Sequence, residues 1–306
     1  MKQLDVAAGT AADAPRGSVP TRAGGLRRRT RDADKPAARS RSALLTTLAW
    51  LLTLLFFAPV AWMFLTSFHR EADAAANPPS LRAPLTLASY RLIFDRGARP
   101  FLQNSMTASV VSTIVVLTLA VPAAYALSIA PVRKWTDVLF FFLSTKFLPP
   151  IAALLPVYLI VQKLHMLDNV WTLVILYTSM NLPIAIWMMR SFLAEVPREI
   201  IEAANVDGAG LLRVIWHVIR PVAAPGLAAT SLICFIFSWN EFMFAVNLTA
   251  TNASTSPVFL VGFISSQGLF LAKLCAAATL VSLPVLIAGF AAQDKLVRGL
   301  SLGAIK

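Results

Sequence analysis

The few acidic residues of this chain are placed in a way that indicates a docking element and not a catalytic one. Four of the 15 Asp and Glu residues fall in the segment 191–221, namely Glu195, Glu199, Glu202 and Asp207. Glu199 and Glu202 lie early in a predicted helix, where the helix dipole favours anions. Gly208 is placed to end that helix in a left-handed turn. The spacing predicts a helix, a turn and a second short helix before Pro221, an element that can dock into a partner's groove.

Residues that could bind a metal ion or act as nucleophiles are scattered. The three histidines are far apart and the two cysteines lie in apolar runs: His69, His165, His217, Cys234 and Cys275. Neither a Cys–Cys nor a Cys–His metal-binding spacing occurs. The sequence also lacks the G-x-x-x-x-G-K-[ST] motif, whose loop cradles ATP phosphates. We therefore expect no catalytic residue, no metal ligand and no ATP-binding site in this chain.

Long uncharged stretches must position the acidic segment. Hydrophobic residues make up 57% of the chain and charged residues 14%, against about 45–50% and about 25% in soluble proteins. A helix needs about 20 mostly apolar residues to cross a bilayer, and runs such as 51–57 lack the alternation of a β-barrel. The sequence predicts an all-α transmembrane fold with six spans, at 44–67, 104–130, 138–161, 170–190, 222–246 and 269–291. Pro149 and Pro150 should break or kink the third span, and a structural role is favoured for Lys146.

The basic residues predict the orientation of these spans. With both termini in the cytoplasm, 19 Lys and Arg residues lie inside and 6 lie outside, as the positive-inside rule requires. The segment 1–42 holds ten of them and almost no large apolar residue, which predicts a disordered basic cytoplasmic tail before a membrane domain at 43–306. We expect this tail to set topology and to attract anionic lipid, not nucleic acid, because aromatic residues are not interleaved with its charges.

The segment 191–221 resembles the signature of a known family. Glu202-Ala203-Ala204, followed in register by Gly208 and Pro221, is similar to the EAA loop of the membrane subunits of binding-protein-dependent ABC importers. The small pair of alanines lets another backbone approach closely. Arg220 departs from the pattern, since the family usually has leucine there, and this puts the packing of the second helix in question. The resemblance extends over nearly the whole chain from about residue 44.

Other stretches narrow the resemblance to the carbohydrate-uptake branch of that family. The segments 146–150, 181–183, 238–242 and 297–304 are similar to the maltose-type second permease. The sequence of the segments 145–150 and 291–295 is most similar to that of the sorbitol and mannitol permeases. The resemblance implies a six-helix type I ABC importer permease that translocates a polyol or sugar, with sorbitol or mannitol favoured. A disaccharide of the maltose or trehalose type is the alternative solute.

The resemblance also implies partners in the bacterial inner membrane. A second permease subunit, a pair of ATP-binding subunits and an extracytoplasmic solute-binding protein would complete the importer. ATP and Mg²⁺ would bind to the ATPase pair, so no cofactor is expected in this chain. The residues implied to couple ATPase closure to movement of the spans are Glu202, Ala203, Ala204, Asp207, Gly208 and Pro221.

Four residues in the predicted spans are candidates for the solute path: Asn181, Trp239, Asn240 and Glu241. Amide and carboxylate groups beside an aromatic face suit a neutral, hydroxyl-rich solute, and polar residues within spans usually face the bundle interior. A structural hydrogen bond between helices is an equal alternative for Asn240 and Glu241. The family resemblance further implies that the segment 255–268 contacts the solute-binding protein.

Two other classes of membrane protein fit the sequence less well. A secondary transporter or channel working alone would need no ATPase, and the register of 202–221 argues against it. A membrane-embedded enzyme would need several His, Asp or Glu residues at one membrane depth, whereas Glu241 is the one acidic residue inside the predicted spans.

Overall fold

The computed structural model describes residues 35–76, 83–129, 133–147, 149–265 and 268–303. The chain divides into two units, Met1–Phe56 and Phe57–Lys306, and helix α1 (Lys35–Thr66) runs across the division. This helix begins at Lys35, inside the segment 1–42 that the sequence predicts to be disordered. The rest of that predicted tail, 1–34, lies outside the described residues.

Helix α1 is apolar over a span-length stretch. Leu44–Thr66 is long and apolar enough to cross a membrane, and its large side chains in the first unit are exposed, among them Leu44, Trp50 and Phe56. A helix that is apolar all round is typical of a membrane span.

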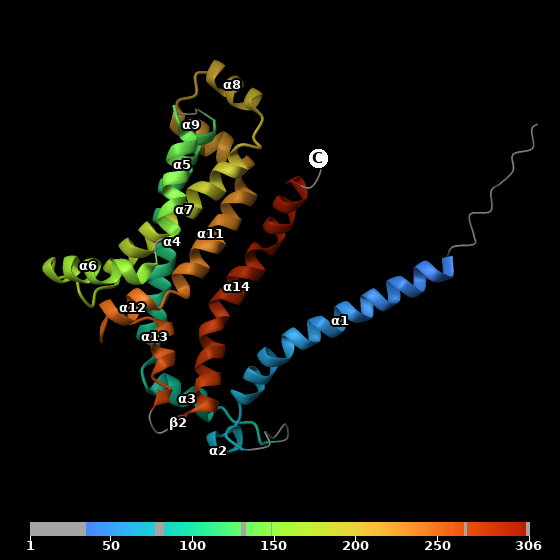
Figure 1. The fold of residues 1–306 in the computed structure, drawn as a ribbon, viewed down its shortest axis with the longest axis vertical. Coiled ribbons are helices and arrows are strands. Elements are labelled where there is room, and N and C mark those ends of the chain that lie inside the picture. The colour runs from blue at the N-terminus through green and yellow to red at the C-terminus, as the bar shows by residue number, and fades with distance from the viewer. Residues whose placement is uncertain (1–34, 77–82, 130–132, 148, 266–267, 304–306) are drawn as a thin grey trace, which may run out of the picture. The chain divides into compact units, whose positions relative to one another are not determined.

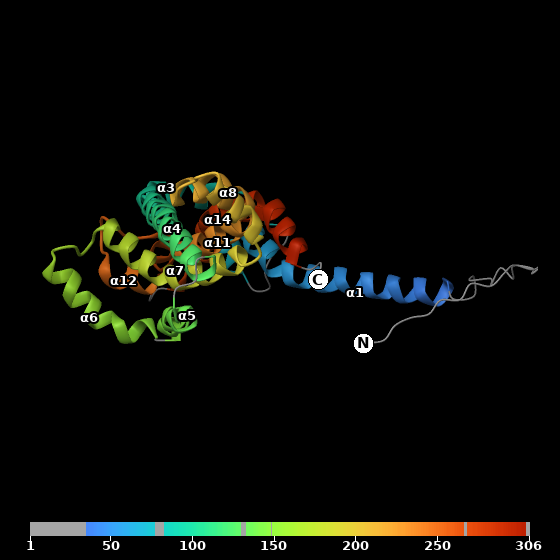
Figure 2. The ribbon, with the colours of Figure 1, turned by 90° about the horizontal axis from the view of Figure 1, so that it is seen from above.

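Four long helices form the body of the second unit. They are α4 (Ala98–Ser128), α7 (Val170–Leu193), α11 (Ala224–Trp239) and α14 (Leu271–Gly303), which lie side by side in Figures 1 and 2. Fully buried alanines face their neighbours on α4 and α7, at Ala108, Ala120, Ala124 and Ala185. Small residues at such contacts let helix backbones approach closely without a hydrophobic driving force.

A broken helix pair lies along the outside of this group. Helix α5 (Trp135–Ser144) continues into a 3₁₀ turn (Thr145–Phe147), and α6 (Pro150–Lys163) then leaves at 89° to it. The bend confirms the break predicted at Pro149 and Pro150. Next to it, the Lys146 ammonium donates a 2.8 Å hydrogen bond to the Met180 carbonyl of α7, which ties the broken pair to the central helices.

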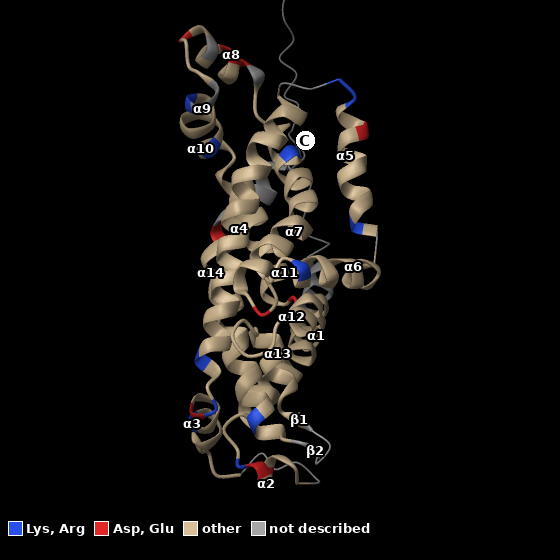
Figure 3. Cartoon of the chain, turned by 90° about the vertical axis from the view of Figure 1, so that its left-hand side faces the viewer, with Lys and Arg blue, Asp and Glu red and all other residues tan. Residues whose placement is uncertain are grey.

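Short elements gather at the two ends of the four-helix group (Figure 1). One end carries α8 (Arg198–Val206), α9 (Leu211–Val214), the π-helix η2 (Ile215–Ile219) and α10 (Arg220–Val222). Toward the other end lie α2 (Glu71–Ala74), α3 (Ala88–Asp95), α12 (Met243–Leu248), α13 (Ser256–Val261) and a two-stranded antiparallel hairpin, β1 (Ile264–Ser265) and β2 (Gly268–Leu269). Figure 3 shows acidic residues on α8 at one end and charged residues on α2 and α3 at the other, with mostly uncharged helices between.

The helices confirm the predicted all-α fold with up to six spans. Within the described residues, four helices are long and apolar enough to cross a membrane, and up to six spans result if each bent pair counts as one. The second bent pair joins Ile215–Val222 to α11 at 78°. The predicted fifth span, 222–246, is not one helix. It stops at Trp239, because the Glu241 carboxylate accepts hydrogen bonds from the Phe244 and Ala245 N–H groups at 2.8 and 3.2 Å and so starts α12.

Candidate functional site

Helix α8 has one face anchored in the protein and one face exposed. Ile201 is buried in a cluster with Leu193 at the end of α7, Val214 of α9 and Ile219 of η2. On the other side of the helix Glu199, Glu202 and Ala203 are exposed, as is Val206, with 87% of its surface accessible. The two faces follow from helical periodicity, because residues three or four apart share a face. The exposed face is both acidic and apolar, a combination that suits contact with another protein.

The turn after α8 is built as its sequence predicts. Gly208 has φ +74°, the left-handed conformation that glycine adopts without a Cβ clash. The Asp207 and Ala209 N–H groups donate to the carbonyls of Ala203 and Ala204, each at 3.0 Å. These bonds satisfy carbonyl groups that the end of the helix would otherwise leave free.

The second helix of this element accommodates the unusual arginine. Arg220 is exposed, and its guanidinium carbon lies 4.9 Å from the centre of the Trp216 ring, also exposed. The buried neighbours are Val214 and Ile219. The departure from leucine at this position therefore places a charge over an aromatic surface, a favourable cation–π arrangement, and leaves the packed face apolar.

A close helix contact fixes the base of the element. Gly226, near the start of α11, is buried against Phe192 at the end of α7, and a Cβ atom on Gly226 would overlap the phenylalanine ring. Neither residue stands out in the sequence. A glycine followed by apolar helix residues is a weak local signal for such a contact, because its partner lies on another helix.

The structure brings the predicted coupling residues to one end of the second unit. Glu202, Ala203, Asp207, Gly208 and Pro221 are exposed there, and the remaining one, Ala204, is half-buried against the cluster below α8. The arrangement makes them accessible to a partner. Their role in coupling stays a prediction.

Two of the predicted solute-path residues are buried between helices. Asn181 has no exposed surface, and its amide nitrogen donates to the Ser238 hydroxyl of α11 at 2.9 Å. The Ser238 hydroxyl also lies 3.1 Å from that of Ser112 on α4, so three helices share one polar contact. Trp239 is 1% exposed and its indole N–H donates to the Val281 carbonyl of α14 at 3.1 Å.

The other two candidates lie where α11 ends. Asn240 is exposed, and its amide nitrogen donates to the Ile236 carbonyl of its own helix at 2.9 Å. Glu241 is partly exposed and caps α12. Since Asn181 and Trp239 are buried, the four side chains do not line one common surface. Their part in a solute path stays a prediction.

Asp168 has a structural role that its sequence context does not predict. Asp168, in the connection between α6 and α7, accepts hydrogen bonds from the backbone N–H groups of Ala250, Thr251, Asn252 and Ala253 at 2.9 to 3.2 Å. Partial burial alone would raise the pKa of the Asp168 carboxyl. The four N–H donors outweigh that effect and hold its pKa well below the usual range. An aspartate between two spans gives no sequence signal of this role, because its donors lie some 80 residues away.

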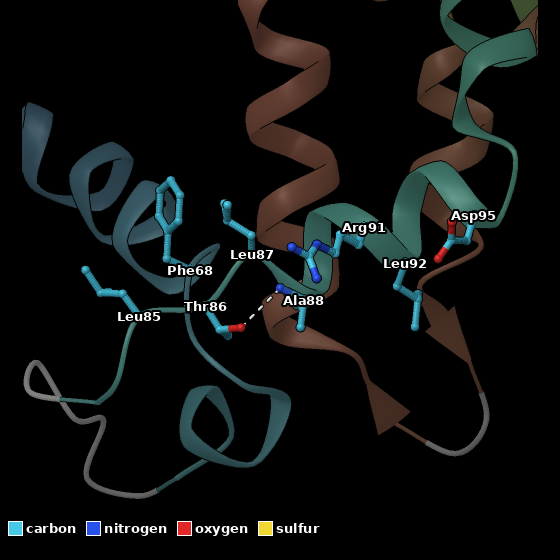
Figure 4. A pocket seen from close by; sticks show the side chains of 8 residues that line it. All are labelled: Phe68, Leu85, Thr86, Leu87, Ala88, Arg91, Leu92 and Asp95. Atoms are coloured by element: carbon cyan, nitrogen blue, oxygen red, sulfur yellow. Dashed lines mark hydrogen bonds between the residues drawn. The ribbon is translucent and has the colours of Figure 1, made fainter.

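A surface hollow of about 720 Å³ lies beside α3, toward the end of the second unit away from α8 (Figure 1). Figure 4 shows the side chains that line it. The hollow is formed around Phe68 and the start of α3, where the Thr86 hydroxyl accepts a 3.2 Å hydrogen bond from the Ala88 N–H. Arg91 and Asp95, one helical turn apart, contribute its charged groups. Elsewhere, the described residues contain no group of three His, Cys, Asp or Glu side chains that could hold a metal ion, and both cysteines are free thiols.

Apolar helices of span length, with an exposed acidic helix–turn–helix at one end, define a multi-pass membrane protein. The chain belongs to the family of binding-protein-dependent transport system inner membrane components, whose model matches residues 116–302. It is 37% identical over 271 residues to the probable ABC transporter permease protein y4oR of Sinorhizobium fredii, covering 88% of this chain and 98% of that protein. The chain is therefore a multi-pass ABC permease of the inner membrane.

Two further relatives have named solutes. The sulfoquinovosyl glycerol transport system permease SmoH of Agrobacterium fabrum is 30% identical, over 81% of this chain and 88% of that protein. The trehalose/maltose transport system permease MalG of Thermococcus litoralis is 29% identical, over 84% and 94%.

A solved structure confirms the type I permease fold. A chain of a bacterial ABC transporter involved in the import of the acidic polysaccharide alginate superposes with a TM-score of 0.70 at 22% identity. The match covers 85% of this chain and 98% of that chain.

Proposed function

We propose that this chain is the permease subunit of an ABC importer for a sugar or polyol, driven by ATPase subunits that dock on α8. The observation that carries the proposal is the two-faced α8, with Ile201 anchored and Glu202 exposed. A partner that grips the exposed face moves the buried face, and Ile201 passes that displacement to the ends of α7 and η2. Rigid-body movement of packed helices is the usual basis of alternating access.

The proposed assembly contains a second permease subunit, a pair of ATP-binding subunits and an extracytoplasmic solute-binding protein. ATP and Mg²⁺ belong to the ATP-binding pair, so this chain needs no cofactor and is not itself an enzyme. With α8 in the cytoplasm, four spans precede it and two follow it if each bent pair is one span. Both termini then lie in the cytoplasm, in agreement with the positive-inside rule.

The proposed solute is a carbohydrate. The relatives that import sulfoquinovosyl glycerol and trehalose or maltose support this class. The resemblance of 145–150 and 291–295 to sorbitol and mannitol permeases favours a polyol, and a disaccharide is the alternative. Asn240 and Glu241 are the proposed solute contacts because they are accessible, whereas Asn181 and Trp239 hold the helix that presents them.

The coupling surface is tested by Glu202→Ala and Gly208→Pro in the assembled transporter. Both variants should lose solute-stimulated ATPase activity and transport while assembling normally. Glu195→Ala is the matched control, because Glu195 is also exposed and acidic but precedes α8. Normal coupling in both test variants would refute the docking of an ATPase on α8.

The partners and the solute are tested by purification in gentle detergent, followed by binding assays on the isolated solute-binding protein with sorbitol, mannitol and maltose. Recovery of ATPase subunits and tight binding of a polyol are the expected results. A preparation without an ATPase subunit that transports on an ion gradient would instead support a secondary transporter.

A further inference from the structure

One carboxylate holds the loop 249–255 that joins α12 to α13. Besides the four backbone N–H groups already described, the Thr251 hydroxyl and the Asn252 side-chain amide donate to Asp168 at 3.2 and 2.9 Å. The backbone N–H of Asp168 also donates to the Leu248 carbonyl at 2.8 Å. Charge-assisted hydrogen bonds of this kind are stronger than neutral ones, so Asp168 holds the loop firmly in position.

Asp168 itself is held in an unusual backbone conformation. Its φ is +53°, in the left-handed region that non-glycine residues rarely occupy. Such a conformation persists only where surrounding contacts enforce it, and it is found most often at functional positions. The hydrogen bonds to 248–253 are the contacts that enforce it here.

The clamp, by which we mean Asp168 and its hydrogen bonds to 248–253, is attached to the start of α7. Asn169 caps this helix by accepting a 2.9 Å hydrogen bond from the Trp171 N–H, and the Thr172 hydroxyl donates to the Met166 carbonyl at 2.6 Å. Helix α7 then runs for 24 residues, or about 36 Å, to Leu193. Leu193 packs in the same cluster as Ile201 of α8. The helix that is clamped to the loop at its start therefore contacts the proposed coupling helix at its end.

The loop is held from a second side by α4. The Asn104 amide donates to the Asn252 and Ser254 carbonyls at 2.8 and 3.0 Å, and the Ser105 hydroxyl accepts from the Ser256 N–H at 2.7 Å. Thr251 and Asn252 are nevertheless exposed. The loop is thus a shaped polar surface and not a free strand of chain.

We propose that Asp168 is a positioning residue that links the loop 249–255 to α8 through α7, so that a solute-binding protein docking on this loop alters ATPase activity at α8. The inference rests on the proposed function. The proposed partner of the loop is a soluble protein, because the exposed Thr251 and Asn252 are neutral and polar and the loop lies on the side of the spans opposite α8, where a solute-binding protein would dock. Asp168 contributes no contact to the solute; it sets the position of the loop relative to α7.

The experiment uses the assembled transporter in lipid nanodiscs with its co-purified solute-binding protein. Asp168→Asn keeps the shape of the side chain but removes its charge. Two quantities are measured, namely hydrogen exchange of the 250–253 amides and ATPase activity with and without the solute-loaded binding protein. We expect amide exchange about tenfold faster or more, since at least one charge-assisted bond is lost. We also expect unchanged basal ATPase activity and about tenfold less stimulation.

Asp95→Asn is the matched control, because Asp95 is an exposed acid on α3, toward the same end of the second unit. It should leave exchange and stimulation unchanged. Asn104→Ala removes the hydrogen bonds from α4 to the same loop, and it replaces Asp168→Asn in the test if that variant fails to assemble. We again expect unchanged basal ATPase activity and reduced stimulation.

Normal stimulation of ATPase activity in Asp168→Asn, despite faster amide exchange, would overturn the proposal. That result would mean that the position of the loop does not affect ATPase activity at α8. An equal fall of basal and stimulated activity would also overturn it, since that result indicates a merely structural role. Hydrogen exchange of the 250–253 amides reports on the clamp without any partner, whereas ATPase stimulation requires the proposed partners. Failure of the clamp and failure of the proposed function are therefore distinguishable.

Discussion

The amide nitrogen of Asn181 lies 2.9 Å from the hydroxyl oxygen of Ser238, and this bond joins α7 to α11 at a point where both residues are buried. The Ser112 hydroxyl of α4 lies 3.1 Å from the same oxygen. A polar side chain inside an apolar span requires a partner, and here the partner is another helix. Asn240 and Glu241 follow Ser238 in the chain after a single residue, Trp239.

The contact predicts a measurable coupling between Asn181 and Ser238. In a double-mutant cycle of Asn181→Ala and Ser238→Ala, the interaction free energy should be about 0.6 kcal/mol and no more than about 1.7 kcal/mol. Thermal unfolding of the detergent-solubilised protein measures it, and the KM for solute should stay unchanged in both single variants. Strictly additive effects together with a raised KM would instead make Asn181 a solute contact.

The Gly226–Phe192 contact predicts an intolerance of any side chain at Gly226. Gly226→Ala should lower the free energy of unfolding by about 1–3 kcal/mol, because the new methyl group overlaps the Phe192 ring. Phe192→Leu in the same chain should restore part of the loss. Gly289→Ala is the control: that glycine is also inside a long helix but has no atom within 4 Å of a Cβ, so the change should not destabilise the protein.

The left-handed turn after α8 predicts a difference between two neighbouring glycines. Gly208→Ala should cost about 1–2 kcal/mol, since φ is +74° there, and should reduce solute-stimulated ATPase activity. Gly210→Ala should have little effect, because Gly210 is not left-handed and has open space around it. Equal activity of the two variants would show that the turn geometry does not matter for coupling.

The depressed pKa of Asp168 predicts a clamp that does not respond to physiological pH. A carboxyl with a lowered folded-state pKa contributes stability above its unfolded pKa of about 3.9 and loses it only as the pH falls through the folded value. The difference in unfolding temperature between the parent protein and Asp168→Asn should therefore be the same from about pH 5 to about pH 8. A difference that shrinks toward pH 5 would mean that the carboxyl is being protonated in the folded protein.

Local chemistry explains what could be predicted from sequence. The spans follow from uncharged runs of bilayer length, and the helix–turn–helix of 191–221 follows from acids, alanines, Gly208 and Pro221 at fixed spacing. Pro149 and Pro150 mark the break between α5 and α6 because proline lacks a backbone N–H, and the missing hydrogen bond disrupts the helix locally. The expectation of one continuous helix over 222–246 was wrong, since hydropathy does not reveal that Glu241 caps a new helix.

By itself, then, the sequence determined the helical membrane fold and the helix–turn–helix of 191–221, because backbone hydrogen bonding and apolar length act within a short stretch of chain. Tertiary structure alone decided which polar residues are buried and what they bind. Asn181 donates a hydrogen bond from α7 to Ser238 of α11, and Asp168 holds a loop some 80 residues away in the chain. Those roles depend on which helices become neighbours, and packing between distant segments sets that.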